Sequence, residues 1–168
     1  MDDVKLDLRP IASAPRELVI AQMNDVGVRR HLPLATGVFD DAAYEGFISG
    51  KEALWREYGY GPWAFFIDDH YAGWGGLQPE DGEAELAPVL CPWAFGNGRM
   101  IAESVIDWGF RECSLSRILI YLPESRFVER YLHRKSCIRK DCVTFEGIVF
   151  TRHCLYSDYD RQLVDQVT

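Results

Sequence analysis

Two glycines and an arginine stand where a predicted strand leads into a predicted helix. Residues 83–90 have the pattern of a strand, and a helix is predicted from Gly96 to about Cys113, with Gly98 and Arg99 in its first turn. A helix start carries free backbone N–H groups and the positive end of the helix dipole. Glycine lets a phosphate approach that backbone closely, and the arginine adds a positive charge. The junction therefore predicts an anion site.

The common nucleotide-binding loops do not account for this site. A Walker loop needs Gly-Lys followed by Ser or Thr, which is absent here. The dinucleotide fingerprint needs a third glycine where Ile101 stands, and the preceding strands form a meander instead of an opening βαβ unit. The alternative interpretation is a turn followed by a capped helix, with no ligand.

Carboxylates on the preceding strand could supply a base. Glu83 and Glu85 share one face of the strand because side chains alternate along it. A carboxylate in that place can take a proton from an amine, directly or through water. We expect Glu83, which follows a turn predicted at residues 79–82, to face solvent. For Glu85 both a functional and a solvent-facing interpretation stay open.

A cluster of potential metal ligands lies near the C-terminus, formed by His133, Cys137, Cys142, His153 and Cys154. Structural zinc sites usually contain tight pairs such as C-x2-C, and no pair here has that spacing. Cys137 and Cys142 lie in strand-like sequence, where a buried cysteine is an ordinary small hydrophobe. We therefore predict no metal site. The odd number of cysteines, 5, indicates reduced thiols.

Length and charge limit the function classes. The chain has 168 residues, 48% of them hydrophobic, and a formal net charge of −8, so we expect a single domain over residues 1–168. The acidic balance argues against a nucleic-acid partner, because the field of the whole protein would oppose phosphates. Residues 1–7 lack the features of a signal peptide, and no apolar run could cross a bilayer, which predicts a cytoplasmic protein without a membrane partner.

The elements that must position these residues form an α+β pattern. Alternation, turn residues and caps predict seven strands and four helices, in the order β-α-α-β-β-β-α-β-α-β-β. The predicted strands are 4–8, 63–67, 71–77, 83–90, 117–122, 138–145 and 148–155. Ser13 is expected to cap the first helix, and Asp40 or Asp41 the second. The remaining helices are 96–113 and 125–135. A crossover helix makes the fourth and fifth strands parallel, so we predict a mixed, mostly antiparallel seven-stranded sheet with flanking helices.

Several motifs in this order resemble the GCN5-related N-acetyltransferase (GNAT) superfamily. The Pro92-Trp93-Ala94-Phe95-Gly96-Asn97-Gly98 loop, followed by Ala102-Glu103, is similar to that family's acetyl-CoA-binding motif. The similarity is greatest to the ribosomal-protein N-terminal acetyltransferase branch. Gly73-Trp74-Gly75-Gly76-Leu77, Trp108-Gly109-Phe110 and Ser116-Arg117-Ile118 also look like that branch, so the resemblance covers nearly the whole chain.

The resemblance implies an acyltransferase that moves an acetyl group from acetyl-CoA to a primary amine, without a metal. It implies that the CoA pyrophosphate is held by the backbone amides of Phe95, Gly96, Asn97, Gly98, Arg99 and Met100. Val89 and Leu90 would offer main-chain groups to the pantetheine arm, which adds like a short strand. Pro88 fits this picture, because a proline within a strand is expected at a bulge or where pairing stops.

The resemblance also implies the catalytic groups. It points to Glu85 as the general base and to Tyr131 as the acid that reprotonates the leaving thiolate, a task that suits a phenol with a pKa of about 10. Tyr131 could instead be a core aromatic of an amphipathic helix. Pro123-Glu124-Ser125 and Lys135-Ser136-Cys137 depart from the family pattern, and Trp93 stands where many members carry Gln or Arg. A non-catalytic CoA-binding or regulatory module is the alternative function.

The acceptor is not specified by the sequence beyond an amine, either a protein N-terminus or a small molecule. Because the chain carries an excess of carboxylates, we hypothesise that a cationic amine would be drawn toward it. The oligomeric state is likewise not specified.

Overall fold

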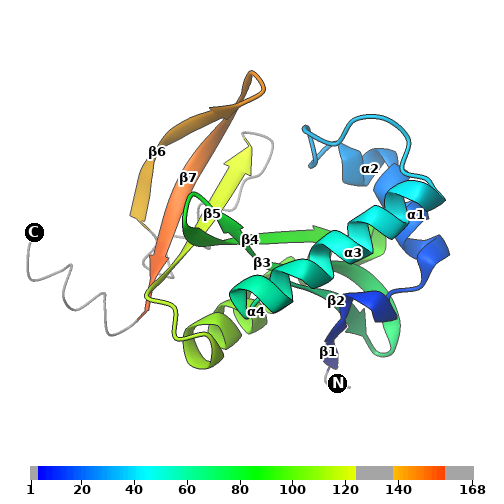
Figure 1. The fold of residues 1–168 in the computed structure, drawn as a ribbon, viewed down its shortest axis with the longest axis horizontal. Coiled ribbons are helices and arrows are strands. Elements are labelled where there is room, and N and C mark those ends of the chain that lie inside the picture. Colours follow the sequence, from blue (N-terminus) through cyan, green and yellow to red (C-terminus); the bar gives the residue numbers. More distant parts are fainter. Residues whose placement is uncertain (1–3, 124–137, 158–168) are drawn as a thin grey trace, which may run out of the picture.

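The computed structural model describes residues 4–123 and 138–157, which form one seven-stranded sheet with helices packed on it. The strand order is β1-β2-β3-β4-β5-β7-β6, and every neighbouring pair is antiparallel except β4 and β5. This confirms the predicted α+β fold with a mixed sheet (Figure 1). The elements are β1 Leu6–Pro10, η1 Ile11–Ser13, α1 Arg16–Asn24, α2 Val26–Arg29, α3 Asp41–Tyr58, β2 Pro62–Ile67, β3 His70–Glu80, β4 Glu83–Leu90, η2 Pro92–Asn97, α4 Gly98–Glu112, β5 Arg117–Pro123, β6 Ile138–Phe145 and β7 Ile148–Tyr156.

The two faces of the sheet are covered by different helices. Phe65 of β2 packs in a cluster with Ile101 and Val105 of α4, whereas its neighbour Phe66 packs with Val19 of α1 and other side chains on the opposite face. Alternation along a strand produces this division, since successive side chains point to opposite faces. Figure 1 shows α3 crossing one face of the sheet. The core therefore has two layers, one on each side of β2, β3 and β4.

β4 and β5 separate soon after they meet. Their parallel ladder holds one residue pair, Glu85 opposite Leu119, although β4 continues to Leu90 and β5 to Pro123. Figure 1 shows the two strands diverging and β5, β6 and β7 forming a separate arm of the sheet. Pro88 lies beyond the last pair, as expected for a proline placed where pairing stops.

β3 lies close against β4 because two of its glycines adopt a backbone conformation that is unusual for other residues. Gly73 and Gly75 both have φ of 141°, a conformation that residues with a Cβ atom rarely adopt. A Cβ at Gly73 would lie 2.2 Å from the carbonyl oxygen of Val89, and one at Gly75 would lie 2.4 Å from that of Ala87. The Gly73-Trp74-Gly75 sequence is therefore required by the close contact between the two strands.

The N-terminal region differs from the sequence predictions in three ways. The first strand does not end at Leu8, as predicted, but runs through Pro10, which pairs with Trp63; an edge strand tolerates a proline because one side of it needs no ladder donor. Ser13 does not cap a helix: its hydroxyl donates to the carbonyl of Pro10, and the residue before α1 is Pro15. The short helix α2 was not expected.

The second predicted helix is confirmed, and Asp40 caps it by accepting a hydrogen bond from the backbone of Ala43 at 2.9 Å. The predicted helix at 125–135 falls outside the described residues. Among the described residues, no helix is long and apolar enough to span a membrane.

Candidate active site

A cavity of about 740 Å³ lies where β4 and β5 separate. Its walls come from Glu85–Leu90 of β4, Ile120–Pro123 of β5 and the loop 31–35, with further side chains from α3, β3 and α4. Most of the lining is apolar, so the few polar and charged groups that face the cavity set its chemistry.

One end of the cavity is formed by the glycine loop and the start of α4. Leu90, Phe95, Gly98 and Arg99 line it, and we call these four residues the amide side. Of the other residues that the sequence analysis predicts to bind CoA, Val89 also lines the cavity. Gly96, Asn97 and Met100 do not, and Met100 packs against the core cluster beside α4.

No side chain caps the start of α4. Asn97, the residue before the helix, makes no side-chain capping hydrogen bond, and the first turn contains no acidic residue. No side chain takes the first amide groups of the helix, and the N–H of Gly98 donates to the carbonyl of Phe95 in the preceding 3-10 turn. The helix begins at Gly98, two residues later than predicted, because Pro92–Asn97 form a separate 3-10 turn. Arg99 forms an ion pair with Glu103 at 3.2 Å.

A buried pair of side chains holds the carbonyl of Val89, next to the amide side. Gln22, 3% exposed, donates its Nε2 to the Val89 oxygen at 2.9 Å and accepts a hydrogen bond from the Tyr71 hydroxyl at 2.7 Å. Because no peptide bond among the described residues is cis, the N–H of Leu90 points opposite to this carbonyl. The backbone N–H of Cys91 donates to Ala72 of β3, which is consistent with the N–H of Leu90 facing away from β3. That direction is the side on which β5 diverges.

The other end of the cavity carries a carboxylate. Glu85 is half-buried, lines the cavity and accepts a hydrogen bond from Nε2 of Gln78 at 3.0 Å. The two residues lie opposite each other in the β3–β4 ladder, on the face away from the buried Ala84 and Leu86. Burial raises the pKa of Glu85 above that of an ordinary glutamate, and the hydrogen bond from Gln78 opposes this rise. Glu85 is therefore a stronger proton acceptor, once ionised, than a solvent-exposed glutamate.

A lysine completes this end of the cavity. Lys51 of α3 donates to Oε1 of Gln78 at 3.3 Å and lies over the Trp74 ring, with 5.2 Å between its Nζ and the ring centre. Burial lowers the pKa of Lys51, and the nearby charge of Glu85 opposes that change. We call Lys51, Trp74, Gln78 and Glu85 the carboxylate side. All four line the same cavity.

Sequence reasoning missed Lys51, Gln78 and Gln22. A signal for Lys51 was present: it follows Phe47 by four residues and precedes Trp55 by four, so it is a cation on the apolar face of α3. Gln78 could be found only by knowing which residue of β3 lies opposite Glu85. Gln22 had no signal, because a glutamine on a helix is usually exposed.

Two other predictions are corrected by the structure. Glu83 does not simply face solvent: it is half-buried, ion-paired with Arg117 and outside the cavity lining. Cys142 of β6 is exposed and not a buried hydrophobe, whereas Cys154 is buried. Tyr131 and Cys137 lie outside the described residues. Among the residues that are described, no three His, Cys, Asp or Glu side chains are grouped as metal ligands.

The structure resembles solved acetyltransferases over almost its whole length, although no protein-family model matches the sequence. An acetyltransferase from Agrobacterium tumefaciens has a TM-score of 0.73 and 18% identity, with 92% of each chain covered. A GNAT-family acetyltransferase from Bacillus anthracis has a TM-score of 0.72 and 17% identity, covering 90% of this chain and 95% of the other. The N-acetyltransferase PseH from Campylobacter jejuni, solved with acetyl coenzyme A, has a TM-score of 0.64 and 13% identity, with 92% and 100% covered. The chain thus has the fold of GNAT acetyltransferases.

Proposed function

We propose that the protein is an N-acetyltransferase of the GNAT superfamily that transfers an acetyl group from acetyl-CoA to a primary amine. The observation that carries this proposal is one cavity that holds a half-buried glutamate at one end and the uncapped start of α4 at the other. The fold neighbours and the motif resemblance to the ribosomal-protein N-terminal acetyltransferase branch support the same conclusion. The acceptor is a small amine or a protein N-terminal amine.

The amide side fits the donor. Backbone amides among residues 95–100 would hold the pyrophosphate, since no side chain caps the helix start and Arg99 adds a positive charge. Gly96 fits a close approach, because a Cβ there would meet nothing within 4 Å and the backbone is open to solvent. The carbonyl of Leu90 would pair with the pantetheine arm along the free edge of β4, since the carbonyl of Val89 is already held by Gln22. When bound, acetyl-CoA supplies the thioester carbonyl that the amine attacks.

Glu85 is proposed to act as the general base. It takes one proton from the acceptor ammonium group; the neutral nitrogen then forms a bond to the acetyl carbon while the carbon–sulfur bond breaks, and the second proton of that nitrogen passes to solvent. The proposed donor to the developing oxyanion is the N–H of Leu90. The hydrogen bond from Gln22 to the Val89 carbonyl orients this peptide group. Gln78 holds the Glu85 carboxylate in place.

The leaving thiolate needs a proton, and Tyr131 is the proposed acid. Tyr121 of β5 also lines the cavity, and burial raises the pKa of its phenol. Comparing Tyr131→Phe with Tyr121→Phe tests the assignment: only the loss of the true acid should lower kcat by about 100-fold without weakening acetyl-CoA binding.

The proposed function is tested by calorimetric titration with acetyl-CoA, followed by assays of CoA thiol release with peptides, polyamines, aminoglycosides and amino acids. With the amine that is turned over, Glu85→Gln should lower kcat by about 100-fold or more and leave acetyl-CoA affinity unchanged. Glu83→Gln is the matched control, because it makes the same change two residues away on the same strand, outside the cavity lining. Binding without turnover of any amine would favour the non-catalytic module, and no binding would contradict the proposal.

A further inference from the structure

Lys51 brings a positive charge to the cavity wall that the proposed acetyl transfer does not use. The contacts of its Nζ are with neutral groups, namely the side-chain oxygen of Gln78 at 3.3 Å and the rings of Trp74 and Phe47, whose centres lie 5.2 and 5.8 Å away. An amide oxygen and aromatic faces stabilise an ammonium group but do not cancel its charge. The cavity therefore presents a cation held in place by neutral partners.

Lys51 and Glu85 are held at a short and fixed separation. Gln78 accepts from Lys51 and donates to Glu85, so the ammonium nitrogen and the carboxylate oxygen are at most about 9 Å apart, given the bond lengths of an amide group. Glu85 is the only carboxylate among the described residues that line the cavity. Around these two charges the wall is largely apolar.

We propose that the acceptor is an amino acid, or a similar small molecule with an amine and a carboxylate a few bonds apart, whose amine meets Glu85 and whose carboxylate meets Lys51. This rests on the proposed function and names its substrate class. A zwitterion matches the two wall charges in number and sign. Its ammonium and carboxylate groups, with a hydrogen bond to each side chain, fit within the separation set by Gln78.

The course of the reaction gives a second reason. When Glu85 takes the proton of the amine, it becomes neutral, and the charge of Lys51 is left in an apolar cavity without a nearby anion. A carboxylate on the acceptor supplies that anion, so it stabilises the state from which the amine attacks. An amine without a carboxylate does not.

Charge also argues against a polyamine. A second ammonium group within a few bonds of the reacting amine would approach Lys51, and like charges repel strongly in a partly desolvated site. This part of the wall thus offers the positive charge of Lys51, which suits an anionic group.

The experiment compares amino acids with their amides, which keep the amine and the side chain but lack the carboxylate. CoA thiol release is measured for the standard amino acids, the corresponding amides and spermidine, with wild type, Lys51→Met and Lys51→Arg. Lys5→Met is the matched control, since it removes the same charge from an exposed site that is outside the cavity lining. For each amino acid and its amide, kcat/KM for the amino acid is divided by kcat/KM for the amide. The two amines differ in basicity, but this difference is the same for wild type and variants, so it does not affect the change in the ratio.

We expect amino acids to be acetylated, and Lys51→Met to lower the ratio of kcat/KM for the amino acid to that for its amide by about tenfold or more. Lys51→Arg should keep most of the wild-type ratio, and Lys5→Met should keep all of it. Equal losses on acid and amide, or a preference of wild type for spermidine or for the amides, would overturn the inference and leave the acetyltransferase proposal standing. Acetyl-CoA binding without acetylation of any amino acid would also overturn it. Failure to bind acetyl-CoA would instead remove the proposed function itself.

Discussion

The two ends of the cavity are built by different means. The amide side is a continuous stretch of chain, in which the end of β4, the 3-10 turn and the first turn of α4 follow one another. The carboxylate side takes Lys51 from a helix and Gln78 and Glu85 from two strands, and hydrogen bonds between side chains join them. The first end offers mainly main-chain groups, whose positions depend on the fold. The second depends on the identity of a few side chains, so it can vary between acceptors while the fold is kept.

The largest expected effect comes from filling the amide side. Gly98→Phe should lower acetyl-CoA affinity by at least about 100-fold, because the ring would occupy the donor end of the cavity. The backbone tolerates the change: Gly98 has φ of −56°, and a Cβ there would lie 3.4 Å from Leu90, an ordinary contact. Calorimetry measures the affinity. Gly50→Phe, at an exposed position of α3 where a Cβ meets nothing within 4 Å, is the control, and wild-type affinity in Gly98→Phe would contradict the assignment.

A smaller effect is expected where the two ends meet, at the Val89 carbonyl. Gln22→Leu removes the hydrogen bond that orients this peptide, and we expect kcat to fall by about tenfold with little change in acetyl-CoA affinity. Tyr71→Phe deletes only the hydroxyl that supports Gln22, so its loss should be smaller. Both variants leave buried polar groups unpaired, at a cost of about 1–3 kcal/mol, so thermal melting must be measured alongside the kinetics. A weaker effect of Gln22→Leu than of Tyr71→Phe would argue against the orienting role.

The carboxylate side is probed by its pH dependence. The hydrogen bond from Gln78 lowers the pKa of Glu85, which burial raises, so Gln78→Leu should raise that pKa further. Because the proposed base must be ionised to work, the acidic limb of kcat/KM, normalised to its own plateau, should move to higher pH, with several-fold less relative activity at the foot of the limb. Acetyl-CoA affinity serves as the internal control and should stay constant. A limb that moved to lower pH would show that another group controls it.

The same contrast explains what the sequence could predict. Strand alternation and the Gly96–Gly98 spacing are local patterns, so the sheet, the helix after the loop and the residues of the amide side could be predicted from the sequence. Lys51, Gln78 and Glu85 come together only through the β3–β4 register and the packing of α3 on the sheet, which no local pattern contains. Glu83 was misjudged for the same reason: its partner Arg117 is 34 residues away in sequence. The wrong cap at Ser13 arose because a serine before a helix can also bond backward, to Pro10.

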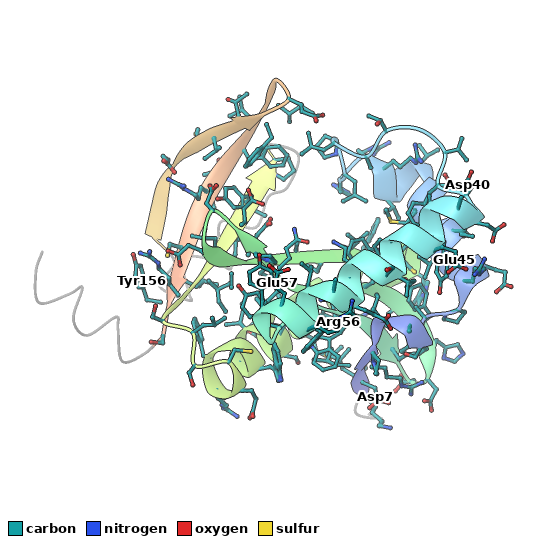
Figure 2. The ribbon with its side chains drawn as sticks, in the orientation of Figure 1. Asp7, Asp40, Glu45, Arg56, Glu57 and Tyr156 are labelled. Atoms are coloured by element: carbon teal, nitrogen blue, oxygen red, sulfur yellow. The ribbon has the colours of Figure 1, made fainter. Side chains whose placement is uncertain are left out.

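The smallest expected effect is that of salt concentration on kcat/KM. It distinguishes a cationic acceptor, drawn by the net charge of the protein, from an acceptor without net charge. The net charge of −8 led to the hypothesis that a cationic amine is drawn toward the protein. Carboxylates such as Asp40, Glu45 and Glu57, labelled in Figure 2, are exposed on and beside α3 and are not part of the cavity lining. Their field reaches a ligand through solvent, and the Debye length shortens from about 30 Å at 0.01 M salt to about 8 Å at 0.15 M.

An acceptor with no net charge is not steered by that field, and the wall charges that meet it are partly buried and less screened. For the best amino acid we therefore expect kcat/KM to change by less than about twofold between these salt concentrations, as measured by CoA thiol release. Leucine methyl ester, a monocation at neutral pH, is a suitable comparison if it is turned over. A several-fold fall for the amino acid would mean that the exposed carboxylates, and not Lys51 and Glu85, dominate its capture, because only long-range attraction to the surface is lost so readily to salt.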